Sequence, residues 1–459
     1  IPTIQSYIRT GDLTYKTLTQ WYLYRIVTYE NDKDKMLNAI VALNPNAVNE
    51  AREKDKNRAT EDHPIYGMPI LVKDNTNVEG MPTTAGTYLL RNNTAPDAFI
   101  IEKAKEKGAI ILGKTNLSEW ANFLFNGGPN GFSAVGGQTL NAYGRRIFDS
   151  SGSSSGSGVA MAANYAVAAV GTETSGSILS PSGKSSLVGL KPTIGLLSRG
   201  GIVPLSGTLD TPGPMTRNVT DNAILLSAMG GEDPDDAATR GNPKNKNYLE
   251  DLRAGTLEGL RFGANKSFLE DSVFRLNIEK IISLGGIVIE FEPESIDFDG
   301  FRDLLGADMK IDLPNYLNKY AADDITSRTM EKIVAYNRED SLVRIPYGQA
   351  RFEEASKIDL KPEELIQLRL RLHREGVRYF ETTILAHQLD AILSLDSQNA
   401  GYAAAAKYPC LTIPMGYMET GQPIGITFIG RPFEEDKLLK MGYAFEQATK
   451  ARKLPKDYK

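Results

Sequence analysis

The sequence has 459 residues, of which 41% are hydrophobic and 24% are charged. These proportions are ordinary for a globular protein and exclude a disordered, collagen-like or coiled-coil chain. The 52 basic and 57 acidic residues give a net charge of −5, without the basic excess of a nucleic-acid-binding protein or a basic cluster suited to an anionic membrane. We expect neither nucleic acid nor a membrane as a partner.

Cysteine and histidine are too scarce for a disulfide framework or a metal centre. Cys410 is the single cysteine and there are three histidines, so we expect no disulfide, no metal site and no cofactor. One cysteine fits a reducing compartment such as the cytoplasm. The sequence begins at Ile1 rather than Met, however, so a removed export signal is an open alternative. The oligomeric state is open as well.

The first predicted elements are helices. In residues 1–64, large side chains such as Leu18, Tyr22 and Ile26 recur at near-helical spacing, which predicts an N-terminal helical segment. From residue 65 onward, short apolar runs alternate with helical stretches. The strands are predicted at 70–72, 109–112 and 167–171, and the helix at 98–107.

The second half continues this alternation. Helices are predicted near 327–341, 362–387 and 434–452, and strands at 285–291, 391–395, 411–414 and 424–429. Alternating strands and helices are typical of an α/β fold whose sheet is covered on both faces. No internal repeat and no clear linker divides the chain, so a single domain is expected.

Residues 108–115, Gly-Ala-Ile-Ile-Leu-Gly-Lys-Thr, match the phosphate-binding loop pattern letter for letter. The match does not predict a phosphate site, because the residues do not suit the way in which a phosphate is bound. A phosphate is held by a loop whose backbone N–H groups turn inward, whereas Ala109 to Leu112 is a buried-strand sequence. We therefore predict a strand followed by a turn, and no nucleotide.

Residues 149–158, Asp-Ser-Ser-Gly-Ser-Ser-Ser-Gly-Ser-Gly, form the most biased segment. A flexible linker is the ordinary meaning of such a run, but this one leads directly into a small-residue helix predicted at 159–163. Gly152 to Gly156 also fits the G-x-S-x-G nucleophile elbow, which requires a hydrophobic strand before it, and the preceding residues are not strand-like. A serine–histidine–aspartate triad is disfavoured too, because His373 and His387 lie in a predicted helix.

Several blocks stand in a fixed order around this run. They are Lys73 at the end of an apolar strand, the run 149–158, Gly-Thr-Glu-Thr-Ser-Gly-Ser at 171–177, Val-Gly-Leu-Lys-Pro-Thr at 188–193, and Asp-Thr-Pro-Gly-Pro-Met at 210–215. With these blocks the sequence resembles the amidase signature family, most strongly over residues 65–225. Several blocks at fixed spacing are far more specific than any single short motif.

The resemblance implies a fold and a division of the chain. The fold is α/β, with a large mixed, mostly parallel, twisted sheet covered by helices on both faces. Residues 1–459 form one amidase domain. Its parts are the N-terminal helical segment 1–64, the amidase signature core 65–225, and a smaller substrate-side portion 226–459 that completes the sheet.

The resemblance also implies a set of site residues. Ser177 is assigned as the nucleophile, Ser153 as the bridging serine and Lys73 as the base, with a cis peptide bond between Gly152 and Ser153. The oxyanion hole is assigned to the backbone N–H groups of Thr174, Ser175, Gly176 and Ser177. The side chains expected around these groups are Ser154, Thr172 and Glu173.

Amide hydrolysis requires the same residue types on chemical grounds. A serine hydroxyl attacks an amide poorly unless a base lies within hydrogen-bond reach. Because the histidines are badly placed, a lysine is the remaining base, and it can act only when neutral. Burial of Lys73 against the apolar strand 70–72 would lower its pKa. Ser153 could relay the proton, since a hydroxyl both donates and accepts.

Two departures from the family pattern are visible. Leu179 stands where many members carry arginine two residues after the nucleophile, which leaves the partner of Glu173 open. Ser175 replaces the usual glycine or aspartate within the oxyanion segment. Lys191 is interpreted as structural, since the following Pro192 favours extended backbone.

The resemblance implies an amidase that works through an acyl-enzyme with a Ser-cisSer-Lys triad. Blocks at 329–337, 347–349 and 443–449 look like the peptide-amidase branch. The expected substrate is thus a small-molecule or peptide amide, converted to the acid and ammonia; its identity is open. Two alternatives stay open: an amidotransferase-type subunit that releases ammonia within a complex, and a catalytically inactive binding module on the same fold.

Overall fold

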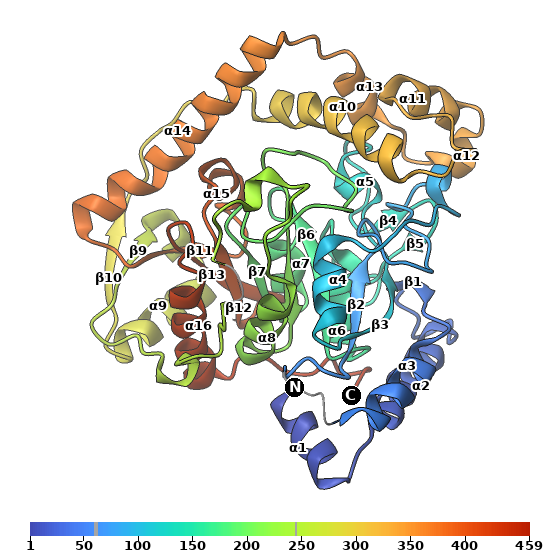
Figure 1. Cartoon of the computed structure of the whole chain (residues 1–459). Helices are drawn as coiled ribbons and strands as arrows, with labels where there is room; N and C mark the ends of the chain where they lie inside the picture. The colour runs from blue at the N-terminus through green and yellow to red at the C-terminus, as the bar shows by residue number, and fades with distance from the viewer. Residues whose placement is uncertain (59–62, 244–245) are drawn as a thin grey trace.

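The computed structural model describes residues 1–58, 63–243 and 246–459. Within these residues, one sheet of 11 strands runs through the molecule in the order β1-β3-β2-β6-β8-β7-β12-β13-β11-β9-β10 (Figure 1). The strands are β1 Ile40–Leu43, β2 Pro69–Lys73, β3 Ile110–Thr115, β6 Ala168–Glu173, β7 Val188–Lys191, β8 Thr211–Thr216, β9 Arg261–Asn265, β10 Ile287–Phe291, β11 Ala391–Leu395, β12 Cys410–Tyr417 and β13 Pro423–Ile429. A separate short hairpin joins β4 Phe132–Ser133 to β5 Gly137–Gln138.

The predicted fold class, a mixed α/β sheet covered by helices, is confirmed, but the expected predominance of parallel strands is not. Parallel pairing joins β2 to β3 and β6, and β9 to β10 and β11. The other six neighbouring pairs are antiparallel. Short connections are one cause of antiparallel pairing. Only residues 418–422 separate β12 from β13. A connection this short reverses the chain, because a parallel crossover needs a dozen or more residues.

Helices cover both faces of the sheet. On one face α8 packs between α4 and α16, and on the other face α6 packs against α7; α6 and α8 both rest on β6 and β8. The helices are α1 Pro2–Thr10, α2 Tyr15–Glu30, α3 Ala47–Lys56, α4 Phe99–Glu106, α5 Glu119–Asn122, α6 Ser155–Ala162, α7 Leu179–Lys184, α8 Val219–Met229, α9 Ser272–Ser283, α10 Phe301–Tyr320, α11 Met330–Arg338, α12 Ser341–Arg344, α13 Ala350–Ser356, α14 Pro362–His387, α15 Ala400–Ala406 and α16 Glu435–Thr449. None of these helices is long and apolar enough to cross a membrane.

The predicted N-terminal helical segment 1–64 contains α1, α2 and α3, but it is not wholly helical. Residues 59–62 lie outside the described residues. Ile40–Leu43 forms β1, which pairs antiparallel with β3 at the edge of the sheet. Four residues are too few to show a strand period within a helix-rich stretch, so tertiary pairing rather than local pattern decides this strand.

The Gly/Ser-rich run 149–158 is not a linker, because it enters α6 at Ser155 and every residue of that helix is buried. A side chain would not fit there: a Cβ on Gly156 would lie 2.4 Å from the carbonyl oxygen of Asn116. Small residues therefore let α6 press against the backbone of the 115–118 segment. This close packing fixes Ser153 and Ser154 at the start of the helix.

The phosphate-loop match at 108–115 contains a buried strand, as predicted, but the turn predicted after Leu112 is wrong, because the strand continues to Thr115. The last six residues of the match form β3, all of them buried. Lys114 is fully buried and its ammonium lies 3.2 Å from the Asp74 carboxylate, so it serves as an internal ion-pair partner. No backbone cradle for a phosphate exists in this strand.

Glu119 is a buried carboxyl group whose stability contribution depends on pH. Oε2 accepts a hydrogen bond of 2.8 Å from the Ala134 amide, and among the described residues Oε1 has no partner. Burial raises the pKa of Glu119 to about 8, far above the unfolded value of about 4.3. The proton held by folded Glu119 therefore stabilises the fold at low pH, and this contribution is lost as the pH rises from about 4 to about 8.

We expect Glu119→Gln to be more stable than the parent protein at pH 8, by about 1–3 kcal/mol in free energy of unfolding. Glutamine keeps the shape and has no charge to desolvate. The advantage should shrink toward pH 4, as the unfolded parent also takes up the proton. Urea unfolding at pH 5 and pH 8 measures this, and an equal difference between the two proteins at both pH values would contradict it.

Candidate active site

Lys73 ends β2 with its side chain completely buried. The parallel pairing of β2 with β6 sets Thr172 beside it. Lys73 Nζ lies 2.7 Å from Ser153 Oγ, 2.8 Å from Thr172 Oγ1 and 3.1 Å from the Thr172 carbonyl oxygen. The amine thus has three hydrogen-bond partners, one of which is the predicted bridging serine.

The environment of Lys73 favours its neutral form. Burial lowers the pKa of Lys73 to about 7, although the negative charges of Asp210 and Glu173 oppose this shift. A buried ammonium loses hydration that the neutral amine does not need. The neutral amine is therefore accessible near neutral pH.

Ser153 and Ser154 are tied by hydrogen bonds to other segments, at Ser118 and at Thr172. The peptide bond between Gly152 and Ser153 is cis, and the Ser118 amide donates to the Ser153 carbonyl at 3.1 Å. The Ser154 hydroxyl donates to the Thr172 carbonyl at 3.0 Å and accepts from the Thr172 amide at 3.2 Å. These bonds attach the start of α6 to the strand next to Lys73.

Ser177 lies in the loop between β6 and α7, with 8% of its surface exposed. Its carbonyl accepts a hydrogen bond of 3.1 Å from the Ser154 amide, so its backbone abuts the Ser153–Ser154 segment. Within the described chain the Ser177 hydroxyl has no hydrogen-bond partner, Ser153 included. The hydroxyl oxygen is not fully buried, so it can be reached from outside the protein.

Glu173, whose partner the sequence left open, is satisfied by backbone amides. Its carboxylate accepts hydrogen bonds from Gly176 at 2.6 Å, Ile178 at 2.7 Å and Leu179 at 2.9 Å. Burial raises the pKa of Glu173, and the charge of Lys191 counteracts part of this shift. Glu173 therefore shapes the Ser177 loop from inside, without the arginine that Leu179 replaces.

This arrangement corrects one predicted oxyanion donor. The Gly176 amide points at Glu173 and is not free to bind an oxyanion. The amides of Ser175 and Ser177 donate no hydrogen bond to any described residue. Of the four predicted donors, Thr174, Ser175 and Ser177 remain.

We expect Glu173→Gln to destabilise the protein by about 1–3 kcal/mol, because glutamine offers one acceptor oxygen and directs its NH₂ against amide donors. Amidase activity should fall roughly 10- to 100-fold as the loop shifts. Thermal unfolding and kcat/KM measure the two effects. Glu102→Gln, at an exposed position of α4, is the matched control, and equal values for the two variants would contradict the role of Glu173.

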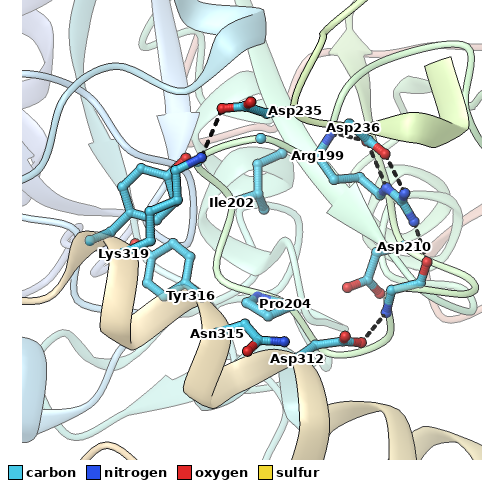
Figure 2. A pocket seen from close by; sticks show the side chains of 14 residues that line it. Arg199, Ile202, Pro204, Asp210, Asp235, Asp236, Asp312, Asn315, Tyr316 and Lys319 are labelled. Carbon is cyan, nitrogen blue, oxygen red and sulfur yellow. Dashed lines mark hydrogen bonds and ion pairs between the residues drawn. The ribbon is translucent and has the colours of Figure 1, made fainter. Parts of the chain in front are cut away.

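Asp210 lies on the other side of the Ser177 loop and was not predicted as a site residue. It accepts a hydrogen bond from the Thr174 hydroxyl, and it lines a cavity of about 290 Å³ between residues 199–210 and α10 (Figure 2). The Asp210–Met215 block marked this position in the sequence but did not reveal its partner. Asn75 was missed too: its side-chain amide donates to Thr172 Oγ1 at 3.0 Å.

The other predicted or rejected groups lie away from this chemistry. His373 is on α14, where Nδ1 lies 2.8 Å from the Ala405 carbonyl oxygen. Lys191 is buried in β7, consistent with its structural interpretation. Across residues 1–58, 63–243 and 246–459, no group of three or more His, Cys, Asp or Glu side chains is arranged to hold a metal ion.

Comparisons with known proteins identify the family of the chain. The Amidase family model matches residues 18–399. The chain is 37% identical to a probable amidase of Arabidopsis thaliana, over 97% of this chain and 88% of that protein. It is 28% identical to one subunit of the glutamyl-tRNA(Gln) amidotransferase of Thermoanaerobacter pseudethanolicus, over 98% and 96%. The structure of the native peptide amidase from Stenotrophomonas maltophilia superposes with a TM-score of 0.92 at 36% identity, covering 98% of this chain and 97% of that one.

The chain therefore belongs to the amidase signature family. It is an amidase, an enzyme that hydrolyses amide bonds.

Proposed function

We propose that the enzyme hydrolyses carboxylic amides or C-terminal peptide amides to the acid and ammonia through an acyl-enzyme. Ser177 is the nucleophile, Ser153 the bridge and Lys73 the base. The observation that carries the proposal is the 2.7 Å contact between Ser153 Oγ and the fully buried Lys73 amine.

The three contacts of the amine fit a neutral base. A neutral amine has two N–H groups and one lone pair. In the neutral form, the bonds donated to Thr172 use both N–H groups and the lone pair faces Ser153. The protonated amine donates to Ser153 Oγ instead, over the same 2.7 Å. With the neutral amine, the Ser153 hydroxyl can donate to Lys73 and accept a proton from Ser177.

The proton path and the bond changes balance in each half-reaction. Ser177 Oγ bonds to the amide carbon as its proton passes to Ser153, whose own proton passes to Lys73. The oxyanion that forms is stabilised by the amides of Ser175 and Ser177, and each such donor lowers the barrier by about 2.7–4 kcal/mol in comparable sites. The proton returns to the nitrogen as the C–N bond breaks and ammonia leaves. Water then repeats the path and releases the acid.

We also propose that residues 226–459 form the substrate-side portion of a single domain. Strands from Ile40 to Ile429 share one sheet, which supports a single domain. The C-terminal part also borders the nucleophile loop: a Cβ on Gly176 would lie 3.7 Å from the Ala400 Cβ, and one on Gly401 would lie 3.6 Å from Ser175 Oγ. A substrate amide that enters beside Ser175 would thus contact residues of both the signature core and the portion 226–459.

The likeness to the Stenotrophomonas peptide amidase favours a C-terminal peptide amide as substrate. The likeness to the amidotransferase of Thermoanaerobacter favours the alternative, a subunit that releases ammonia within a complex. An inactive binding module is the less supported alternative, because Lys73, Ser153 and Ser177 are all present.

Ammonia release by the isolated enzyme separates these functions. The panel contains an amidated dipeptide, the same dipeptide with a free carboxylate, benzamide and L-glutamine. Rapid release from the amidated dipeptide supports the proposal. Release confined to glutamine would favour the amidotransferase-type subunit, and release from none of them would favour the binding module.

A further inference from the structure

We propose that Asp210 is a positioning residue for this reaction: through the Thr174 hydroxyl it fixes the loop that carries Ser177. This inference rests on the proposed function, in which Lys73 must lose a proton to act. Asp210 does not contact the reacting hydroxyls, so it acts through Thr174 and through its charge.

The sheet register brings Asp210 to the nucleophile loop. Asp210 directly precedes β8, and β8 pairs antiparallel with β6 so that Thr211 lies opposite Glu173. One residue beyond this pair, the Thr174 hydroxyl donates to Asp210 Oδ1. Thr174 is also three residues before Ser177, so the Asp210 carboxylate anchors the free end of the loop that Glu173 shapes from inside.

The carboxylate is itself held in place by a tight turn. Asp210 Oδ2 accepts hydrogen bonds of 2.8 Å from the amides of Leu205 and Ser206. All these bonds are to one carboxyl group, which leaves it little freedom to rotate. Asp210 is thus pre-positioned before any substrate arrives.

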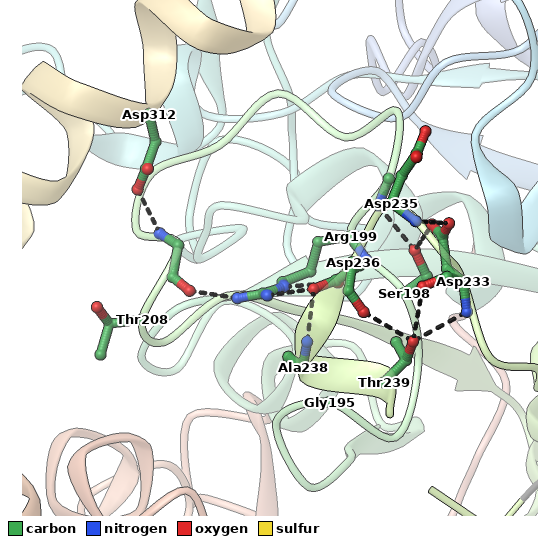
Figure 3. Close-up of polar contacts among 12 residues, drawn as sticks. Gly195, Ser198, Arg199, Thr208, Asp233, Asp235, Asp236, Ala238, Thr239 and Asp312 are labelled. Carbon is green, nitrogen blue, oxygen red and sulfur yellow. Dashed lines mark hydrogen bonds and ion pairs between the residues drawn. The ribbon is translucent and has the colours of Figure 1, made fainter. Parts of the chain in front are cut away.

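Two outer contacts brace the turn at Gly207 (Figure 3). The Gly207 amide donates to Asp312 of α10 at 2.7 Å, and its carbonyl accepts from the Arg199 guanidinium. Arg199 is in turn clamped by Asp236, with Nε 2.9 Å from Oδ2 and Nη2 2.5 Å from Oδ1. A bidentate pair of this kind fixes geometry as well as charge, so the chain of contacts from Asp236 to Thr174 is continuous.

Charge is the second means by which Asp210 acts. Burial lowers the pKa of Lys73, and of the groups that oppose this shift Asp210 contributes most, followed by Glu173. Burial raises the pKa of Asp210 to about 6, and the hydrogen bonds from Thr174, Ser206 and Leu205 oppose this shift, as does the charge of Arg199. Glu173 is compensated by Lys191 and by three amides. The Asp210 charge therefore holds the proton on Lys73 to a higher pH than burial alone would allow.

The test uses the pH dependence of kcat/KM with an amidated dipeptide. Asp210→Asn keeps the size and removes the charge, so we expect the acid limb of the profile to move down by about one pH unit. Thr174→Val removes the hydroxyl and keeps the charge; we expect kcat to fall roughly 10- to 100-fold while the acid limb stays in place. Asp235→Asn is the matched control, because Asp235 lines the same cavity but pairs with Lys319 at its exposed rim (2.9 Å; Figure 2).

Each outcome decides one part of the proposal. An acid limb that does not move in Asp210→Asn, or that moves equally in Asp235→Asn, overturns the charge role. A Thr174→Val enzyme with the kcat of the parent overturns the anchoring role. Should Asp210→Asn not fold, Asp210→Ser removes the same charge with a smaller side chain and is expected to show the same downward shift. A parent enzyme with no acid limb near pH 7 would instead refute Lys73 as the base, which keeps the two failures distinguishable.

Discussion

Ser177→Ala is expected to lower kcat/KM for an amidated dipeptide by roughly 10⁴- to 10⁶-fold, the loss seen when a serine nucleophile is removed. Alanine deletes only a hydroxyl that has no hydrogen-bond partner among the described residues, so the fold should be retained. The hydrogen bond that the Ser154 amide donates to the carbonyl of residue 177 is unaffected by the change. Steady-state kinetics and thermal unfolding measure both effects.

The control for this variant lies three residues further along the chain. The Ser180 hydroxyl is 2.6 Å from that of Ser151, at a part-buried position outside the predicted oxyanion hole. Ser180→Ala should therefore keep most of the activity. Comparable activity in the two variants would remove Ser177 from the nucleophile role.

Lys73→Met is expected to reduce kcat/KM by roughly 10³- to 10⁵-fold, because methionine fills the same space without a base. Lys73→Arg should be equally inactive, since a guanidinium does not give up its proton at any working pH. The parent enzyme should lose activity about tenfold per pH unit below pH 7, as Lys73, with a pKa of about 7, becomes protonated. Appreciable activity in Lys73→Arg at pH 8 would contradict the assignment.

Much of this site could be predicted from the sequence because its residues belong to blocks with fixed spacing. The blocks point to Lys73, Ser153 and Thr172, and the structure places Ser153 Oγ and Thr172 Oγ1 within hydrogen-bond distance of the Lys73 amine. The catalytic roles themselves are still proposals. The features that were missed depend on three-dimensional register instead: the Thr174–Asp210 contact follows from the pairing of β6 with β8, and the amides around Glu173 follow from loop conformation. Neither leaves a local signal in the residues involved.

The helices and strands also divide into those that local sequence predicts and those that depend on tertiary packing. The strand at 391–395 was predicted with the bounds of β11, because four of its five residues are apolar. Helix α10, Phe301–Tyr320, was missed, since Gly306 and Pro314 interrupt a helical pattern that tertiary packing tolerates. Helix α6 begins four residues before its predicted start at 159, because close packing at Gly156 outweighs the poor helix propensity of serine and glycine.

The roles of Ser177 and Lys73 are tested together by the rate at which the enzyme forms its acyl-enzyme at different pH values. The enzyme is mixed with an activated aryl ester, quenched at short times and digested, and the acylated peptide is identified by mass spectrometry. We expect label on Ser177 alone, with an acylation rate that rises about tenfold per pH unit and levels off near pH 7. Label on another residue, or a rate constant that is the same from pH 5 to pH 9, would contradict these roles.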